Sequence, residues 1–201
     1  MIRILCADLA AADEQLFPVL YEMASPERKT RADACRQPGD RLRCVTAEAL
    51  LRKVLGRSDY RIEKNAFGKP CIRDLPGFYY NLSHSGRYVV IAWGDTEVGV
   101  DVQQHRDRSN VTALAERFFA PDELDLVRRE PHRFYEIWTK KESYLKYTGR
   151  GLQKDLRSFS VLAPEPGIRY QNWALEGSYS LSLCSSDCDC TMELLDIRQL
   201  L

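Results

Sequence analysis

Three side chains with oxygen donors are spaced so that they could meet at one site. Residues two apart in a strand project from the same face, so Asp101 and Gln103 point together at the end of a strand predicted over residues 97–102. Glu142 supplies a second carboxylate from a predicted helix. Mg²⁺ takes oxygen ligands, usually with only one or two protein carboxylates, and completes its octahedron with waters and substrate phosphates. The three residues therefore form a candidate magnesium site.

Glu142 also belongs to a helical stripe that places an acid beside a base. Residues four apart are stacked on a helix, so Trp138, Glu142 and Lys146 share one side of a helix predicted over residues 134–147. An ordinary surface ion pair of Glu142 and Lys146 has the same spacing. Asp101 could equally do no more than end its strand. The spacing alone leaves the catalytic and the structural interpretations open.

Basic side chains and a histidine are candidate partners for a phosphate group. Between positions 28 and 43 the basic residues outnumber the acidic ones, and they are Arg28, Lys29, Arg31, Arg36, Arg41 and Arg43. His84 lies in the polar segment Asn81-Leu82-Ser83-His84-Ser85-Gly86, at the exit of a predicted strand. A run of charges is often a solvated helical face, and a lone histidine is often a hydrogen-bonded turn residue. Both alternatives stay open.

The composition argues against several classes of function. The chain has 201 residues, with 29 Lys and Arg against 29 Asp and Glu, so no global charge attracts nucleic acid or an acidic membrane surface. No apolar run approaches the roughly 20 residues that a membrane span needs, and residues 1–12 do not resemble a signal peptide. We therefore expect a cytoplasmic protein whose seven cysteines are reduced.

Several common catalytic and metal-binding motifs are missing from the sequence. It contains no GxxxxGK[ST] loop, no GxGxxG fingerprint, no HExxH helix and no GxSxG elbow. Cys184, Cys188 and Cys190 are close in sequence, but their spacing does not match that of a zinc site. The commonest nucleotide-binding, zinc-protease and serine-hydrolase interpretations are therefore not supported.

The periodicity of the apolar residues predicts strands alternating with helices. Strands are expected over residues 2–7, 60–62, 78–82, 88–93, 97–102, 159–162, 179–183 and 192–197. Helical turns are expected to about residue 35. Three longer helices should follow: one from Asp40 to Gly56, one that begins near Ser109, and one from residue 134 to the glycines Gly149 and Gly151.

Turn residues and element order then indicate the fold class. Gly94-Asp95, between the strands over residues 88–93 and 97–102, indicates a hairpin, and Gly68-Lys69-Pro70 argues against regular structure. Hairpins crossed by long helices favour an α+β fold. Because the strand-then-helix order occurs once before about Gln103 and again after it, two lobes of similar build are expected.

Four motifs follow one another along most of the chain, and two of them are specific in combination. They are Phe67-Gly68-Lys69-Pro70, Asn81-Leu82-Ser83-His84-Ser85, Gly99-Val100-Asp101-Val102 and Trp138-Thr139-Lys140-Lys141-Glu142-Ser143-Tyr144-Leu145-Lys146. Together they resemble the 4′-phosphopantetheinyl transferases of the surfactin-synthetase-activating (Sfp) type. The glycine-Val-Asp strand and the Trp-x-x-Lys-Glu-Ser-x-x-Lys helix carry most of this resemblance.

The resemblance implies a monomer of two similar α+β lobes in pseudo-twofold arrangement, each a small antiparallel sheet packed with a long helix. The expected lobes are residues 1–102 and 103–201, with coenzyme A in the cleft between them. The implied enzyme is a Mg²⁺-dependent holo-[acyl-carrier-protein] synthase. In the reaction that the resemblance implies, a serine hydroxyl of an apo acyl or peptidyl carrier protein attacks the phosphorus next to pantetheine and releases 3′,5′-ADP. Neither nucleic acid nor a membrane is an expected partner.

The resemblance also implies roles for individual residues. The expected magnesium ligands are Asp101, Gln103 and Glu142. The expected coenzyme A ligands are Arg28, Arg31, Arg43 and His84 around the 3′-phosphate, with Lys69 and Ser83 along the same nucleotide. Glu142 is the candidate base for the serine proton, and Lys146 would stabilise or protonate the leaving oxygen.

Gln103 departs from the family, which often has glutamate two residues after the strand aspartate. An amide oxygen can ligate a cation or orient a water, but it adds no negative charge and cannot act as a base. This shifts the base function to Glu142. Two alternatives stay open: a catalytically inactive relative that binds carrier proteins or nucleotides, favoured only by Gln103, and an interaction domain in which the four motifs are coincidental.

Overall fold

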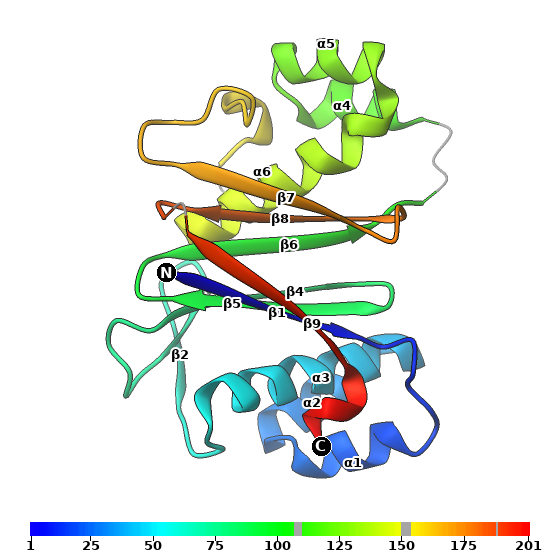
Figure 1. Ribbon diagram of the computed structural model, residues 1–201, viewed down its shortest axis with the longest axis vertical. Coiled ribbons are helices and arrows are strands. Elements are labelled where there is room, and N and C mark those ends of the chain that lie inside the picture. Colours follow the sequence, from blue (N-terminus) through cyan, green and yellow to red (C-terminus); the bar gives the residue numbers. More distant parts are fainter. Residues whose placement is uncertain (107–109, 150–153, 188) are drawn as a thin grey trace.

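The computed structural model describes residues 1–106, 110–149, 154–187 and 189–201, which form helix, sheet, sheet and helix layers (Figure 1). The first helical layer consists of α1 (Leu16–Met23), α2 (Pro26–Asp33) and α3 (Pro38–Leu55). It covers a four-stranded sheet with the order β4 (Tyr79–Ser85), β5 (Tyr88–Gly94), β1 (Ile2–Asp8) and β9 (Cys190–Asp196).

A second sheet packs against the other side of the first. It has three strands in the order β6 (Val98–Gln104), β8 (Tyr179–Ser185) and β7 (Arg169–Leu175). The second helical layer consists of α4 (Val111–Phe118), α5 (Pro121–Arg129) and α6 (Phe134–Thr148). A separate two-stranded sheet contains β2 (Ile62–Lys64) and β3 (Pro70–Ile72), and short 3-10 helices η1 (Pro131–Arg133), η3 (Leu156–Ser158) and η4 (Ile197–Leu200) connect or end elements. None of the described helices is long and apolar enough to cross a membrane.

The two large sheets share one connectivity, which confirms the expected α+β fold with two similar halves. In the first, the chain runs from β1 through α3 to the hairpin β4–β5; in the second, it runs from β6 through α6 to the hairpin β7–β8. The strand orders β4-β5-β1 and β7-β8-β6 correspond position by position. The two sheets thus place β1 and β6, and α3 and α6, in equivalent positions.

The strand β9 breaks this equivalence and corrects one expectation. β9 pairs in parallel with β1, from Ile2 opposite Cys190 to Asp8 opposite Asp196, so the first sheet is mixed and not antiparallel. The chain returns to the first half after completing the second. A division into residues 1–102 and 103–201 stays a prediction and does not coincide with the sheets, because β6 extends across residue 102 and β9 belongs to the first sheet.

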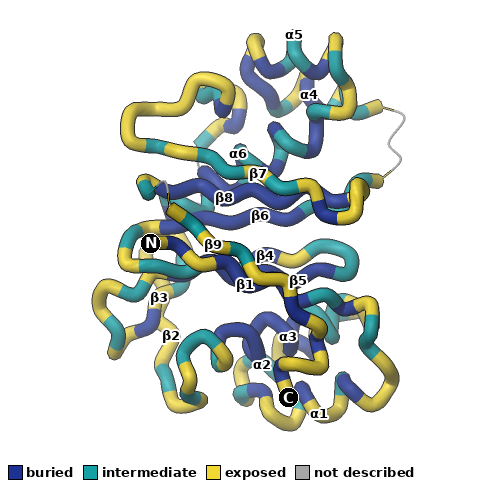
Figure 2. Tube along the Cα trace, in the orientation of Figure 1, coloured by how far each residue is buried: buried dark blue, intermediate teal, exposed yellow. Residues whose placement is uncertain are grey.

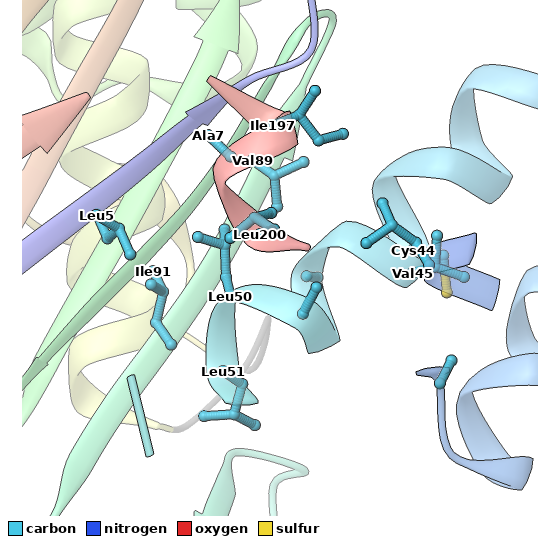
Figure 3. Packing of buried hydrophobic residues seen from close by; sticks show 14 of the residues in the cluster. Leu5, Ala7, Cys44, Val45, Leu50, Leu51, Val89, Ile91, Ile197 and Leu200 are labelled. Atoms are coloured by element: carbon cyan, nitrogen blue, oxygen red, sulfur yellow. The ribbon is translucent and has the colours of Figure 1, made fainter. Parts of the chain in front are cut away.

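Buried apolar residues join α3 to the first sheet. Leu50 of α3 points toward Val89 of β5, with Leu200 of η4 beside it (Figure 3). Several of these side chains are fully buried, so the packing of α3 follows from its apolar positions despite an uncapped start at Gln37. At its other end, Gly56 adopts the left-handed conformation (φ 64°) that ends many helices. The expected end of this helix is confirmed.

A second group of buried residues lies between the two sheets and decides which way β6 faces. Val98, Val100 and Val102 belong to this group, and buried residues are concentrated on β5, β6 and β8 (Figure 2). Because side chains alternate along a strand, Asp101 and Gln103 are directed to the opposite face of β6, toward α6. The apolar alternation of β6 therefore positions the polar side chains of the candidate site.

The hairpin expected around Gly94-Asp95 is wrong. β6 pairs with β8 and not with β5, so the chain changes sheets at this turn. Gly94 is not among the described glycines that have a positive φ. A Cβ there would lie 2.6 Å from Cδ1 of Ile2 and 3.2 Å from the carbonyl oxygen of Met1, so a larger residue would have to displace the Ile2 side chain.

Several other expectations need correction. No strand forms over residues 159–162; Phe159 and Val161 pack instead against the helices of the second half. The sequence did not predict α5 or β7. The strand expected over residues 60–62 begins at Ile62, and Pro70 begins β3 despite the expected loop. Ser109, Gly151 and Cys188 lie outside the described residues.

Candidate active site

Asp101 of β6 and Lys146 of α6 form the ion pair at the centre of the candidate site. Lys146 Nζ lies 2.7 Å from Asp101 Oδ1, 2.9 Å from Ser83 Oγ and 3.0 Å from the carbonyl oxygen of Val100. Asp101 is only 7% exposed. The structure therefore contradicts the interpretation of Lys146 as the partner of Glu142 in a surface pair, because Lys146 binds across to β6.

Glu142 projects into a cleft from the same side of α6. The cleft has a volume of about 270 Å³ and is also lined by Lys146, by Asn81 and by the turn of residues 67–70. Within the described residues the Glu142 carboxylate forms no hydrogen bond or ion pair. Burial raises its pKa, the charge of Asp101 raises it further, and Lys146 opposes both. A carboxylate with a raised pKa is a better proton acceptor near neutral pH.

Gln103 occupies a neighbouring position and not the cleft itself. It lines a small cavity of about 110 Å³ together with Phe134, Tyr135 and Trp138. Trp138 precedes Glu142 by one helical turn. Gln103 beside Trp138 and Asp101 beside Glu142 therefore occupy successive positions along β6 and α6. The structure brings Asp101 and Glu142 close enough to influence each other's charge, and places Gln103 one step along the strand. Within the described ranges no three His, Cys, Asp or Glu side chains form a metal-binding group.

The polar motif on β4 joins the two sheets. Asn81, Ser83 and Ser85 alternate along the strand and accept hydrogen bonds from the backbone N–H groups of β6. The distances are 2.9 Å to Val100 N, 3.3 Å to Val102 N and 3.0 Å to Gln104 N, in that order. β6 is an edge strand, so the backbone N–H groups on its outer side have no neighbouring strand to donate to. The side chains of β4 accept these hydrogen bonds instead. The alternation of polar residues was the sequence signal for this contact.

His84 lies on the opposite face of β4, beside Arg43. Although His84 has exposed surface, desolvation by the surrounding protein lowers its pKa, and the cations of Arg43 and Lys146 lower it further. Arg43 itself donates to the carbonyl oxygen of Gly86 at 2.7 Å and pairs with Asp40 at 2.5 Å. His84 thus lies in the positive field of Arg43 and Lys146, near the ion pair of Asp101.

Arg28 and Arg31 line a different cavity, between α2, α3 and β2. Its volume is about 510 Å³, and neither Arg43 nor His84 lines it. Arg28 is 12% exposed in its side chain and pairs with Glu48 at 3.4 Å, whereas Arg31 is exposed. The cavity is also lined by three basic residues that the sequence analysis missed, Arg61, Lys64 and Arg73. The four expected phosphate ligands are therefore divided between two places.

Lys69 fastens the turn of residues 67–70 to α6. Its ammonium pairs with Glu97 and donates to the carbonyl oxygens of Tyr147, at 2.9 Å, and Val98, at 3.2 Å. The side chain is 11% exposed. Lys69 lines the cleft, but its charged end binds protein groups. Its expected contact with a nucleotide stays a prediction.

A buried ion pair that the sequence analysis missed supports α6 from behind. Lys141 and Glu123 are both completely buried, with 2.7 Å between Nζ and Oε2. Lys141 also donates to the carbonyl oxygens of Leu156 and Phe159, each at 2.7 Å. A signal was present, because Lys141 interrupts the apolar stripe that Ile137 begins at helical spacing. This pair fixes the residue next to Glu142.

Comparisons with known proteins agree with the motifs. A family model described as the 4′-phosphopantetheinyl transferase superfamily matches residues 97–187. The 4′-phosphopantetheinyl transferase Sfp of Bacillus subtilis is 35% identical over 154 residues, which cover 71% of this chain and 68% of the relative. The transferase psf-1 of Bacillus pumilus is 32% identical over 195 residues, with coverage of 86% and 81%. HetI of a Nostoc species is 33% identical over 169 residues, with coverage of 75% and 71%. With motifs, fold and relatives in agreement, the chain belongs to the 4′-phosphopantetheinyl transferase superfamily and is of the Sfp type.

Proposed function

We propose that this chain transfers 4′-phosphopantetheine from coenzyme A to a serine hydroxyl of an apo acyl or peptidyl carrier protein. The observation that carries the proposal is the cleft lined by Glu142 and Lys146 of α6, with Asp101 of β6 paired to Lys146, in a member of this family. In the reaction, the serine oxygen forms a bond to the phosphorus next to pantetheine. The bond from that phosphorus to the oxygen of 3′,5′-ADP breaks, and 3′,5′-ADP leaves.

Glu142 is the proposed base for this step. Its carboxylate forms no hydrogen bond or ion pair in the described part of the chain, so an oxygen that does not bind the cation could accept the serine proton as the new bond forms. Gln103 cannot take this role because an amide has no basic oxygen at neutral pH. The position of Glu142 in the cleft therefore suits this carboxylate to the role of base.

Asp101 and Glu142, with Gln103 as a neutral oxygen donor, would hold Mg²⁺. The fit rests on the two carboxylates, because the charge of Asp101 helps to raise the pKa of the Glu142 carboxyl and a cation between the two groups would relieve that repulsion. Two protein carboxylates match the usual share for Mg²⁺. When bound, the cation would neutralise charge that develops on the phosphate oxygens. The part of Gln103 in this site is itself a proposal.

Lys146 would place a positive charge beside the leaving group. All three N–H donors of its ammonium are used, by Asp101, Ser83 and Val100. Direct protonation of the leaving oxygen would therefore require one of these bonds to break. Electrostatic stabilisation does not require it, and phosphoryl transfer depends mainly on such stabilisation and on positioning.

The phosphates of coenzyme A would bind to the two basic regions. Arg43 and His84 lie near Lys146, and Arg28 and Arg31 line the separate cavity of about 510 Å³. Because Arg28 is paired with Glu48, the unpaired cations of that cavity within the described residues are Arg31, Arg61 and Lys64. Charge-assisted hydrogen bonds from such groups suit a terminal phosphate.

Intact mass spectrometry tests the proposed function directly. An apo carrier protein is incubated with the chain, coenzyme A and Mg²⁺, and we expect its mass to rise by one phosphopantetheine. Retained binding of coenzyme A without a mass change would instead identify a catalytically inactive relative. A cytoplasmic monomer without nucleic-acid or membrane partners remains the prediction made from the sequence.

A further inference from the structure

The hydroxyl of Ser83 is fully used inside the protein. A serine hydroxyl has one donor and two acceptor lone pairs. Ser83 Oγ donates to Asp101 Oδ1 at 2.9 Å, and it accepts from Lys146 Nζ at 2.9 Å and from Val102 N at 3.3 Å. These contacts use its whole hydrogen-bonding capacity. Ser83 therefore has no hydrogen bond left for a nucleotide phosphate, the role that the family resemblance implies.

The same contacts fix one oxygen of Asp101 and leave the other available. Oδ1 accepts from both Ser83 and Lys146, whereas Oδ2 forms no hydrogen bond within the described residues. The side chains of Ser83 and Asp101 come from the edge strands of two different sheets. Ser83 is only 7% exposed, so its position is set by packing as well as by hydrogen bonds.

We propose that Ser83 is a positioning residue that orients Asp101 and Lys146 for cation binding, and not a ligand of coenzyme A. The proposal rests on the proposed function, because it assigns Asp101 to the magnesium site. Partners that orient a metal ligand typically change metal affinity by about 10- to 100-fold when they are removed. Ser83 would have this effect from the first half of the molecule, while Asp101 and Lys146 belong to elements of the second.

Ser85 provides a matched control on the same strand. Like Ser83, it accepts a hydrogen bond from a backbone N–H of β6, at 3.0 Å from Gln104 N, but no contact with Asp101 or Lys146 is found for it in the described structure. Ser83→Ala and Ser85→Ala therefore remove the same kind of link between the sheets. A merely structural role would give both variants the same behaviour.

Two titrations by isothermal calorimetry separate the alternatives. Coenzyme A is titrated into each variant with EDTA present, and Mg²⁺ is titrated into the free protein and into its complex with coenzyme A. For Ser83→Ala we expect unchanged coenzyme A affinity without metal and Mg²⁺ affinity weaker by about tenfold or more. Ser85→Ala should match the wild type in both titrations, and Ser83→Thr, which keeps the hydroxyl, should regain most of the Mg²⁺ affinity.

Other results would overturn the proposal. Weaker metal-free binding of coenzyme A to Ser83→Ala would make Ser83 a nucleotide ligand, and unchanged Mg²⁺ affinity would remove it from the site. If Ser83→Ala does not fold, as judged by its thermal transition, Ser83→Cys keeps the volume with a weaker donor and takes its place. If the wild type binds Mg²⁺ but does not bind coenzyme A and transfers nothing from it, the proposed function is contradicted. The Mg²⁺ titration of the free protein would still test the role of Ser83.

Discussion

Gly99 of β6 lies directly beneath the backbone of Ser143 in α6. A Cβ on Gly99 would be 2.0 Å from the Ser143 carbonyl oxygen and 2.4 Å from the backbone nitrogen of Tyr147. Helix backbone cannot yield as a flexible side chain can, so any larger residue must displace α6. Because Ser143 and Tyr147 each follow a residue of the candidate site, this contact sets the height of Glu142 and Lys146 above β6.

Gly99→Ala should therefore impair both stability and transfer. Overpacking of this kind typically costs about 1–3 kcal/mol, and a displacement of about 1 Å at an active site can reduce the rate about a hundredfold. Urea denaturation and the mass assay measure the two effects. Gly39→Ala is the control for stability alone, because its Cβ would meet only the end of the Arg43 side chain, at 3.3 Å, and Arg43 is itself a proposed coenzyme A ligand. A stable Gly99→Ala variant of normal activity would show that α6 tolerates displacement.

Glu142→Gln should reduce transfer by at least about a hundredfold, the scale of losing a preorganised charged group, and Asp101→Asn should do the same. Glu142→Gln should also make the metal-free protein more stable at neutral pH. The raised pKa means that the folded state holds the Glu142 proton more tightly than the unfolded chain, so stability is lost as pH rises from the unfolded to the folded pKa. Glutamine stays neutral throughout.

The stability difference between Glu142→Gln and the wild type should disappear below the ordinary pKa of a glutamate, where both are uncharged. Urea denaturation in EDTA, repeated from acid to neutral pH, measures this. A variant that is less stable than the wild type at neutral pH would mean that the carboxylate is favourably placed in the folded chain, against the direction of its pKa.

Lys141→Met should be strongly destabilising. It leaves Glu123 completely buried without its cation, which typically costs about 3–5 kcal/mol. The double variant with Glu123→Gln should lose less than the sum of the two single losses, and a double-mutant cycle by urea denaturation gives the coupling. Lys140→Met, which removes the neighbouring and more exposed partner of Glu136, should change stability by no more than about 1 kcal/mol. Additive losses would show that the buried pair is not coupled.

Dephospho-coenzyme A should bind more weakly than coenzyme A by roughly 1.5–3 kcal/mol, the value of a hydrogen bond to a charged group. The same comparison in Arg31→Ala and Arg61→Ala asks which cavity holds the 3′-phosphate. If it is the cavity of about 510 Å³, both variants should lose discrimination between the two ligands, while Arg129→Ala on α5 should keep it. Equal binding of both ligands by the wild type would make these arginines a solvated face.

Gln103→Glu should tighten Mg²⁺ binding and leave transfer equal or faster, because it adds a charge near the two carboxylates. Titrating the transfer rate with Mg²⁺ measures the effect. If the wild type shows no transfer and Gln103→Glu does, the site has lost its activity through Gln103. Weaker apparent Mg²⁺ affinity would instead indicate that the amide NH₂ donates a required hydrogen bond.

The parts of the site that depend on local periodicity could be predicted. Glu142 and Lys146 were placed on one helical stripe, and Asp101 and Gln103 on one face of a strand, because each relation involves residues only two or four apart. What periodicity did not give was the partner of each residue. Lys146 binds Asp101 across a gap of 45 residues in sequence, and no local pattern distinguishes that contact from a pair with Glu142.

The failures in the fold have the same origin. Gly94 indicated a hairpin because a glycine in a turn is usually needed for its conformation, whereas here it has no positive φ and packs closely against Ile2. Phe159 and Val161 looked like strand residues, but they fill the core beneath α4 and α6. β7 was missed because its outward residues are exposed on an edge strand and show little apolar alternation. Pairing and packing between distant segments decided each of these cases.

The parallel pairing of β9 with β1 has a consequence for the order in which the protein can fold during synthesis. β1 precedes every other described strand in the chain and β9 follows them all, so one edge of β1 stays unpaired until β9 has left the ribosome. An exposed strand edge is a template for pairing with other chains, and incompletely folded intermediates aggregate through such edges. The first sheet to begin is thus the last to close, and a nascent chain halted before residue 190 offers that open edge to its neighbours.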